Sequence, residues 1–284
     1  MSEPSVIHDI GYQRYSGARL GRGYAARSLF VHGLRTAFGL GRSAKAKIFP
    51  WIVVGIVLLV AAIVTAVGAY VPEPPMEYAE FPENMTMLII LFCAVVGPEL
   101  VSRDLRSGVL PLYFSRPLER SDYALAKLGA LIVAVWLVLA SAQLLMFIGA
   151  AFGADRMGQV WDEFVDFAAA VGYSGMYAVL FSAIALLVGS LSSRRAVAAA
   201  VIVAVFLVTT PVVGVLYAVG DQTTQQLASI ASPMTLLGGV GDWLFEPTGV
   251  SDVGEFGPLY ASAAVALVIV CVTFLLARYR KVGS

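Results

Sequence analysis

Long apolar runs alternate along the chain with shorter polar segments. The hydrocarbon core of a bilayer is about 30 Å thick, and a helix needs roughly 20 apolar residues to cross it. Six runs are near or above this length, and we predict that each forms a transmembrane helix. These runs are Trp51–Tyr70, Met85–Val101, Leu128–Gly153, Phe167–Gly189, Ala196–Gly220 and Pro258–Ala277.

The segment before the first run has helical periodicity. From Tyr24 to Leu40, apolar residues recur every three or four positions, and polar residues group on the opposite side. A basic amphipathic helix beside a span most simply lies in the inner membrane interface, with its cations facing headgroups. The alternative is an anchoring helix with no other role. The apolar positions are Leu29, Phe30, Leu34, Ala37 and Phe38, and the polar positions are Ser28, His32, Arg35 and Thr36.

The segment 221–257 is the longest connection between predicted spans. It holds two apolar pieces, Leu227–Leu237 and Val240–Phe245, which are interrupted by Pro233 and three glycines. Pieces this short cannot cross a bilayer. We therefore predict a re-entrant or interfacial hairpin, a structure tolerated at membrane depth where protein or a water-filled cavity covers the backbone.

The composition agrees with a membrane protein. The 284 residues are 59% hydrophobic and 13% charged, with a mean hydropathy of +0.82. We predict an all-α polytopic membrane protein with six transmembrane helices, an N-terminal amphipathic interfacial helix and a re-entrant outer hairpin before the last helix. Its expected organisation is a cytoplasmic N-terminal segment, 1–47, and a six-helix transmembrane domain, 48–284. The first apolar run begins too deep in the chain for a cleaved secretory signal.

Charged residues divide by sign between the two faces of this layout. With the N-terminus inside, eighteen of the nineteen Lys and Arg residues fall on the inner side, and only Arg156 falls outside. Thirteen of the nineteen Asp and Glu residues fall outside, so the net charges are +12 inside and −12 outside. Lys and Arg in short loops near span ends mark the cytoplasmic side. We therefore predict that both termini are cytoplasmic.

Several motifs that indicate an enzyme or an ion-driven transporter are missing. The sequence contains no G-x-x-x-x-G-K-[ST] phosphate-binding loop. Its two histidines, His8 and His32, lie outside the spans, which offer only unassisted hydroxyl groups as nucleophiles. The span centres also lack the ionisable groups that ion-coupled transporters usually keep there. We therefore expect no enzyme, and any energy for transport would enter from the cytoplasm through a partner.

A few polar and small residues within the spans are candidates for special roles. Gln143 either contacts a substrate or forms an inter-helix hydrogen bond, and we favour the bond. Cys93 and Cys271 are expected to be packing residues rather than ligands of a soft metal. Gly149 and Gly153 permit close helix approach, either inside one bundle or between subunits.

The connection between the second and third spans is the most informative segment. From Glu99 to Lys127 it reads ELVSRDLRSGVLPLYFSRPLERSDYALAK. Asp104 stands four residues before Gly108, an apolar run follows, and Ser115-Arg116-Pro117 comes next. Arg120, Asp122 and Leu125-Ala126-Lys127 complete a pattern that resembles the type-two ATP-binding-cassette exporter permeases. Val109, Pro111, Asp104 and Ala126 depart from the commoner residues of that pattern.

This resemblance implies a permease subunit of an ATP-driven exporter in a bacterial-type inner membrane. It implies a separate ATP-binding-cassette ATPase as partner, with ATP and Mg on that partner and no cofactor in this chain. It also implies a second permease copy, identical or homologous, surrounded by membrane lipids and without nucleic acid. Apolar span walls favour a hydrophobic or amphipathic substrate. The alternatives are a non-transporting six-span scaffold or anchor and a passive channel, which would need deep polar pore-lining residues.

We expect the loop between the second and third spans to receive the ATPase. Apolar residues on the water-facing side of a basic surface are explained if a protein covers them, and nearby charges would fix the register. The loop could instead fold back on its own bundle or into headgroups. The predicted coupling residues are Asp104, Arg106, Gly108, Leu110, Leu112, Tyr113, Arg116 and Pro117, flanked by Glu99, Arg120, Asp122 and Lys127.

Overall fold

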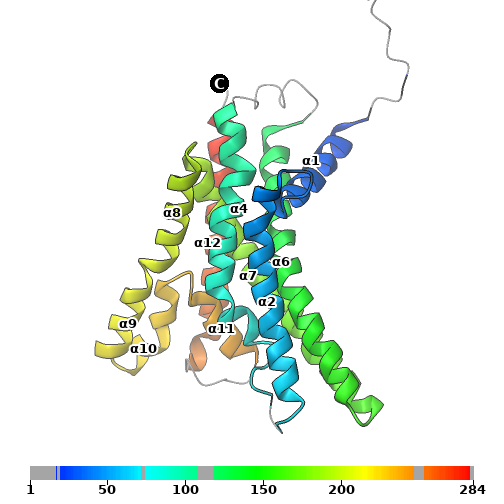
Figure 1. The fold of residues 1–284 in the computed structure, drawn as a ribbon. Helices are drawn as coiled ribbons and strands as arrows, with labels where there is room; N and C mark the ends of the chain where they lie inside the picture. Colours follow the sequence, from blue (N-terminus) through cyan, green and yellow to red (C-terminus); the bar gives the residue numbers. More distant parts are fainter. Residues whose placement is uncertain (1–16, 18–19, 72–73, 108–117, 246–252, 282–284) are drawn as a thin grey trace, which may run out of the picture.

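The computed structural model describes residue 17 and residues 20–71, 74–107, 118–245 and 253–281, and within these ranges all regular secondary structure is helical. Most of the helices run along one axis of an elongated bundle (Figure 1). The helices are α1 (Arg22–Ala37), α2 (Ala44–Gly68), α3 (Phe81–Asn84), α4 (Thr86–Ser107), α6 (Arg120–Gly153), α7 (Met157–Leu191), α8 (Arg195–Leu207), α9 (Thr210–Val219), α10 (Gln222–Leu227), η1 (Ala228–Ala231), α11 (Leu236–Leu244), η2 (Gly254–Phe256) and α12 (Gly257–Lys281).

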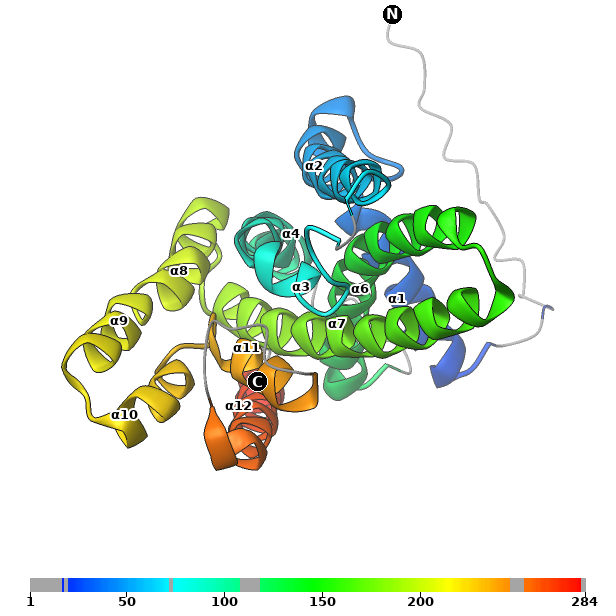
Figure 2. The same cartoon turned by 90° about the horizontal axis from the view of Figure 1, so that it is seen from below.

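The helix α7 forms the centre of the bundle. It lies between α4 and α6 on one side and α12 on the other, and it contacts all three (Figure 2). Among the long apolar helices, α7 has the most buried apolar stretch, with 72% of that stretch buried inside the chain. Tyr177 and Phe181 on this helix are fully buried, and Phe181 stacks on Phe206 of α8 with ring centroids 4.7 Å apart.

Among the described residues, five helical stretches are long and apolar enough to cross a membrane, and one of them is made of α8 and α9 together. They match five of the six predicted spans. The remaining predicted span, Met85–Val101, falls on α4, whose apolar part Thr86–Ser102 is shorter. The count of six therefore stays a prediction. The helix α4 continues through Pro98 to Ser107, beyond the end of the predicted span at Val101.

Two predicted elements are broken into shorter pieces. The predicted span Ala196–Gly220 consists of α8 and α9, which are separated at Val208–Thr209. Pro211 lies in the first turn of α9, where proline is tolerated, whereas it would disrupt a helix interior. The predicted hairpin consists of α10, η1 and α11, of which Leu236, Leu237 and Val240 are buried. Its place in the membrane stays a prediction.

Small residues allow close packing inside the chain. Gly149 of α6 lies directly against Thr65 of α2, with no room for a side chain, whereas Gly153 faces open space. The close approach allowed by Gly149 therefore occurs within one bundle. Ser102 adds a polar link between α4 and α7, because its hydroxyl donates to the carbonyl of Gly189 at 2.9 Å.

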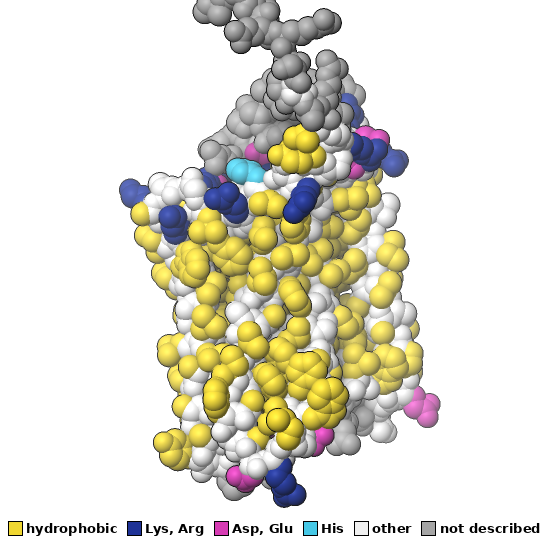
Figure 3. Space-filling view, turned by 90° about the vertical axis from the view of Figure 1, so that its right-hand side faces the viewer, with side chains coloured by type: hydrophobic (Ala, Val, Ile, Leu, Met, Phe, Trp, Pro, Cys, Tyr) yellow, Lys and Arg dark blue, Asp and Glu magenta, His cyan; other side chains and the backbone are white. Residues whose placement is uncertain are grey.

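The helix α1 packs at one end of the bundle, against α6 and α4. Leu29, Gly33 and Ala37 are buried, while Arg27, His32 and Arg35 on the other side are exposed. Most of the Lys and Arg side chains in view gather at this end, beside a broad band of hydrophobic side chains (Figure 3). This arrangement fits the predicted amphipathic helix, and its position in the interface stays a prediction.

Candidate functional site

The predicted coupling loop joins α4 to α6. Arg106 lies in the last turn of α4, and its side chain is not described. Six further predicted residues lie outside the described residues: Gly108, Leu110, Leu112, Tyr113, Arg116 and Pro117. The flanking residues are described, and they show how the two ends of the loop are held.

A buried ion pair joins the end of α4 to the start of α6. The Nζ atom of Lys127 lies 2.9 Å from Oδ2 of Asp104, and the hydroxyl of Tyr123 donates to the same oxygen at 2.7 Å. The ammonium group also lies 5.4 Å from the centre of the Tyr123 ring, within the range of a cation–π contact. A buried charge is tolerated when it is paired and hydrogen-bonded, as here. Asp104 is thus engaged inside the chain.

Aromatic and polar contacts extend this link to α12. Tyr123 packs on Tyr279 with ring centroids 5.2 Å apart, and both side chains are fully buried. Nearby, the guanidinium of Arg120 donates to the backbone carbonyl of Arg280. The start of α6 is therefore fixed to the end of α12 as well as to α4.

A second ion-pair cluster surrounds Glu99. This residue is buried in α4, and its two carboxylate oxygens form ion pairs with Arg42 and Arg195. Arg42 lies in the connection between α1 and α2, and Arg195 begins α8. One carboxylate thereby joins three segments that are far apart in the sequence.

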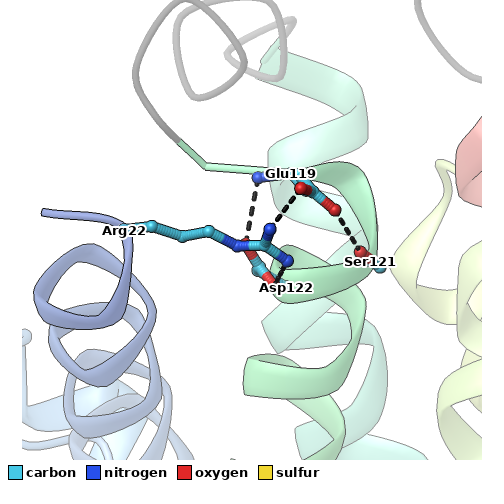
Figure 4. Close-up of polar contacts among 4 residues, drawn as sticks. All are labelled: Arg22, Glu119, Ser121 and Asp122. Atoms are coloured by element: carbon cyan, nitrogen blue, oxygen red, sulfur yellow. Dashed lines mark hydrogen bonds and ion pairs between the residues drawn. The ribbon is translucent and has the colours of Figure 1, made fainter.

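The N-terminus of α6 is tied to α1 by Arg22. The Nε and Nη2 atoms of Arg22 donate to the two oxygens of Asp122 at 2.6 and 2.7 Å, and Nη1 donates to Glu119 (Figure 4). Glu119 and Asp122 also form a capping box at the start of α6. The hydrogen bond with Asp122 raises the pKa of the Arg22 guanidinium above its already high value. The contact of Arg22 with Asp122 is bidentate, which is the geometry that arginine favours with carboxylates.

Gln143 of α6 is fully buried, against α7 and the connection between α2 and α3. Its Nε2 atom donates to the carbonyl of Tyr78 at 3.0 Å, and its Oε1 atom accepts from the hydroxyl of Ser174 at 2.9 Å. The inter-helix hydrogen bond favoured from the sequence is therefore present.

Sequence reasoning found the acidic members of these clusters but missed most of their partners. Arg22, Arg42 and Arg195 were counted only as cations of the inner face, and Tyr123 and Tyr279 were not singled out. The available signal was a group of arginines at helix ends on the side where Glu99, Asp104 and Asp122 also fall. Their pairing depends on tertiary contacts.

These features define a helical, multi-pass membrane protein in which the two helices flanking one connection are held to their neighbours by ion pairs. The family described as ABC-2 family transporter protein has a model that matches residues 74–279, and the chain belongs to this family. None of the curated proteins compared with the chain matches it. The chain is therefore a membrane component of an ABC transporter and is not itself the catalytic subunit.

Proposed function

We propose that this chain is the permease subunit of an ATP-driven exporter. In this proposal it pairs with a second permease copy and with separate ATPase chains, which bind ATP and Mg. The match to the ABC-2 family over residues 74–279 carries the proposal. The charge division supports an orientation with both termini in the cytoplasm and an inner-membrane location of the bacterial type.

The ion pairs support a coupling role for the connection between α4 and α6. A force applied between these helices would move both together, because Asp104 and Lys127 hold their ends. The helix α1 would follow through Arg22, and α8 would follow through the ion pair of Glu99 with Arg195. Rigid elements with two possible arrangements are a physical route by which one site can bias another.

The proposed substrate is hydrophobic or amphipathic and leaves the cytoplasm or the inner leaflet. Apolar side chains dominate the described helix surfaces, including the exposed faces of α2, α8 and α12. Only 22% of the apolar stretch of Arg195–Val219 is buried within the chain. Such a face suits either lipid or a second permease copy at the proposed substrate path.

Loop variants test the coupling role. Tyr113→Ala and Arg106→Glu should leave membrane abundance unchanged and weaken co-purification of the ATPase. A desolvated interfacial contact is worth on the order of 2–5 kcal/mol, and a contact at an exposed rim is worth much less. Matched controls are Tyr24→Ala and Arg27→Glu, which alter exposed residues of the same types on α1. If the loop variants bind the ATPase and export like the parent, the coupling role is wrong.

A further inference from the structure

An apolar cavity of about 500 Å³ opens on the side of the bundle between α6, α7 and α12. Ile132 and Trp136 of α6, Met176 of α7 and Val265 and Ile269 of α12 contribute to its walls. Two glycines of α7, Gly172 and Gly175, also line the cavity and leave it larger because they have no side chains. A methyl group at Gly172 would meet no atom within 4 Å, and one at Gly175 would lie 3.7 Å from the Trp136 ring.

The cavity offers an apolar surface at mid-membrane depth. The described side chains that line it are all apolar, and the indole N–H of Trp136 already donates to the carbonyl of Val171 at 3.0 Å. Ile132, Val179 and Ile269 lie about twelve residues from the inner ends of their helices, or about 18 Å at a rise of ~1.5 Å per residue. An occupant at this depth has to be hydrocarbon-like, since a polar group would remain unsatisfied.

A basic surface lies at the inner end of the same face. Arg280 follows Ile269 by eleven residues, which is close to three full helical turns, so both lie on one stripe of α12 about 16 Å apart. Arg280 is exposed, and Arg120 of α6 lies against the Arg280 carbonyl. The nearby carboxylates Glu119 and Asp122 are already engaged by Arg22. The inner end of the groove is therefore suited to an anion.

The outer end has the opposite charge. Leu237 closes the cavity on that side, and the neighbouring Gly238 lies against the carboxylate of Glu83. Asp242 follows on the same short helix, α11. An anionic headgroup from the outer leaflet would meet these carboxylates, whereas one from the inner leaflet would meet arginines.

We propose that this groove binds an anionic phospholipid of the inner leaflet. One acyl chain lies between α6 and α12 and ends in the cavity beside Ile269, and the phosphate contacts Arg280. The distance of about 16 Å from Arg280 to Ile269 matches the tail depth of one leaflet, about half of a 30 Å hydrocarbon core. Basic pockets between transmembrane helices on the cytoplasmic side suit such headgroups. The proposal concerns a bound lipid and does not depend on which substrate the protein moves.

Native mass spectrometry of the full chain tests this site by titration with phosphatidylglycerol and phosphatidylcholine of equal chain length. We expect tighter binding of phosphatidylglycerol. Arg280→Gln should reduce that preference by about fivefold. Arg27→Gln, on the exposed side of α1, is the matched control and should keep it.

Chain length and cavity filling test the position of the tail. Ile269→Trp places a larger side chain at the depth of the tail end and should weaken long-chain phosphatidylglycerol strongly, while Ile63→Trp, at an exposed position of α2, should not. Phosphatidylglycerol with chains too short to reach the cavity, and inorganic phosphate alone, should bind weakly to every form. Equal binding of both headgroups, or no effect of Ile269→Trp, would overturn the proposal. Displacement of lipid by a second copy of the chain in the groove would also overturn it.

Discussion

At the residue scale, three carboxylates at the end of the bundle that carries α1 hold cations from other segments. Asp104 holds Lys127, Glu99 holds Arg42 and Arg195, and Asp122 holds Arg22. The Glu99 carboxylate and the pair of Asp104 with Lys127 are largely buried, whereas Arg22 and Arg195 are about half exposed. Removing one partner of a buried pair leaves an uncompensated charge, so these residues affect folding before they affect a partner protein.

The pair of Asp104 and Lys127 gives a direct test by double-mutant cycle. Asp104→Leu and Lys127→Met should each lower the free energy of unfolding by on the order of 3–5 kcal/mol, because each leaves a buried charge unpaired. The double variant should be more stable than the sum of the two changes predicts. Unfolding in mixed micelles measures this, with Arg35→Met on the exposed side of α1 as control. Additive effects would show that the pair has no energetic role.

At the element scale, α1 is docked on α6 by a tight contact and by the bidentate contact of Arg22 with Asp122. A methyl group at Gly33 would lie 2.8 Å from Cβ of Ala130, closer than such atoms approach in folded proteins. At its other end, the indole N–H of Trp51 donates to the carbonyl of Phe38 at 3.2 Å. The helix is thus fixed along much of its length to α6 and α2.

Substitution at Gly33 should release α1 from α6. Overpacking costs about 1–3 kcal/mol, so Gly33→Leu should speed amide hydrogen exchange in α1 by about tenfold or more. Gly23→Leu is the matched control, because a Cβ at Gly23 in the same helix meets no atom within 4 Å. Unchanged exchange in Gly33→Leu would contradict the docking described for α1.

The short helix α11 carries a pH-sensitive carboxylate. Burial raises the pKa of Asp242 to about 6, and Glu83, whose own pKa is raised by burial and then by Asp242 and Glu80, lies close by. Above pH about 6 the folded protein holds a charged Asp242 at a cost in stability. This cost shrinks as the pH falls below about 6 and disappears below the ordinary pKa of the group.

Asp242→Asn should therefore stabilise the protein at neutral pH and have less effect in acid. We expect about 1 kcal/mol at pH about 7, after allowance for solvent screening of a half-exposed carboxylate, and less at pH about 4.5. Thermal unfolding at both pH values measures the effect. Asp155→Asn alters an exposed acid in the connection between α6 and α7 and serves as the control, which should lack this pH dependence. A destabilising effect at neutral pH would refute the burial argument.

At the scale of the whole molecule, the apolar runs predicted most of the long helices because span length is set by the bilayer. Pattern alone did not predict that α4 extends beyond Val101 to Ser107, because this polar extension is held by tertiary contacts such as those of Asp104 with Lys127 and Tyr123. The partner of Gly149 and the cations of Glu99 were also not predictable. These contacts join residues that are far apart in the sequence, and charge counting assigns a side of the membrane rather than a neighbour.

The orientation of the molecule can be tested by cysteine labelling. In a background without Cys93 and Cys271, single cysteines at Glu80 and Asp252 should react with an impermeant reagent in intact cells. Cysteines at Arg106 and Arg194 should react only after permeabilisation, because positive charge marks the cytoplasmic side. Labelling of the latter pair in intact cells would reverse the orientation.

The central claim is that this permease is energised from the cytoplasmic side by a separate ATPase. ATP hydrolysis in proteoliposomes tests it most directly, with the purified chain alone, with its ATPase, and with the ATPase plus the Tyr113→Ala variant. We expect no hydrolysis by the chain alone, since the sequence has no phosphate-binding loop. The complex should hydrolyse ATP, and Tyr113→Ala should lower the rate while membrane abundance stays normal. Hydrolysis by the highly purified chain alone, or a complex indifferent to the loop variant, would contradict this account.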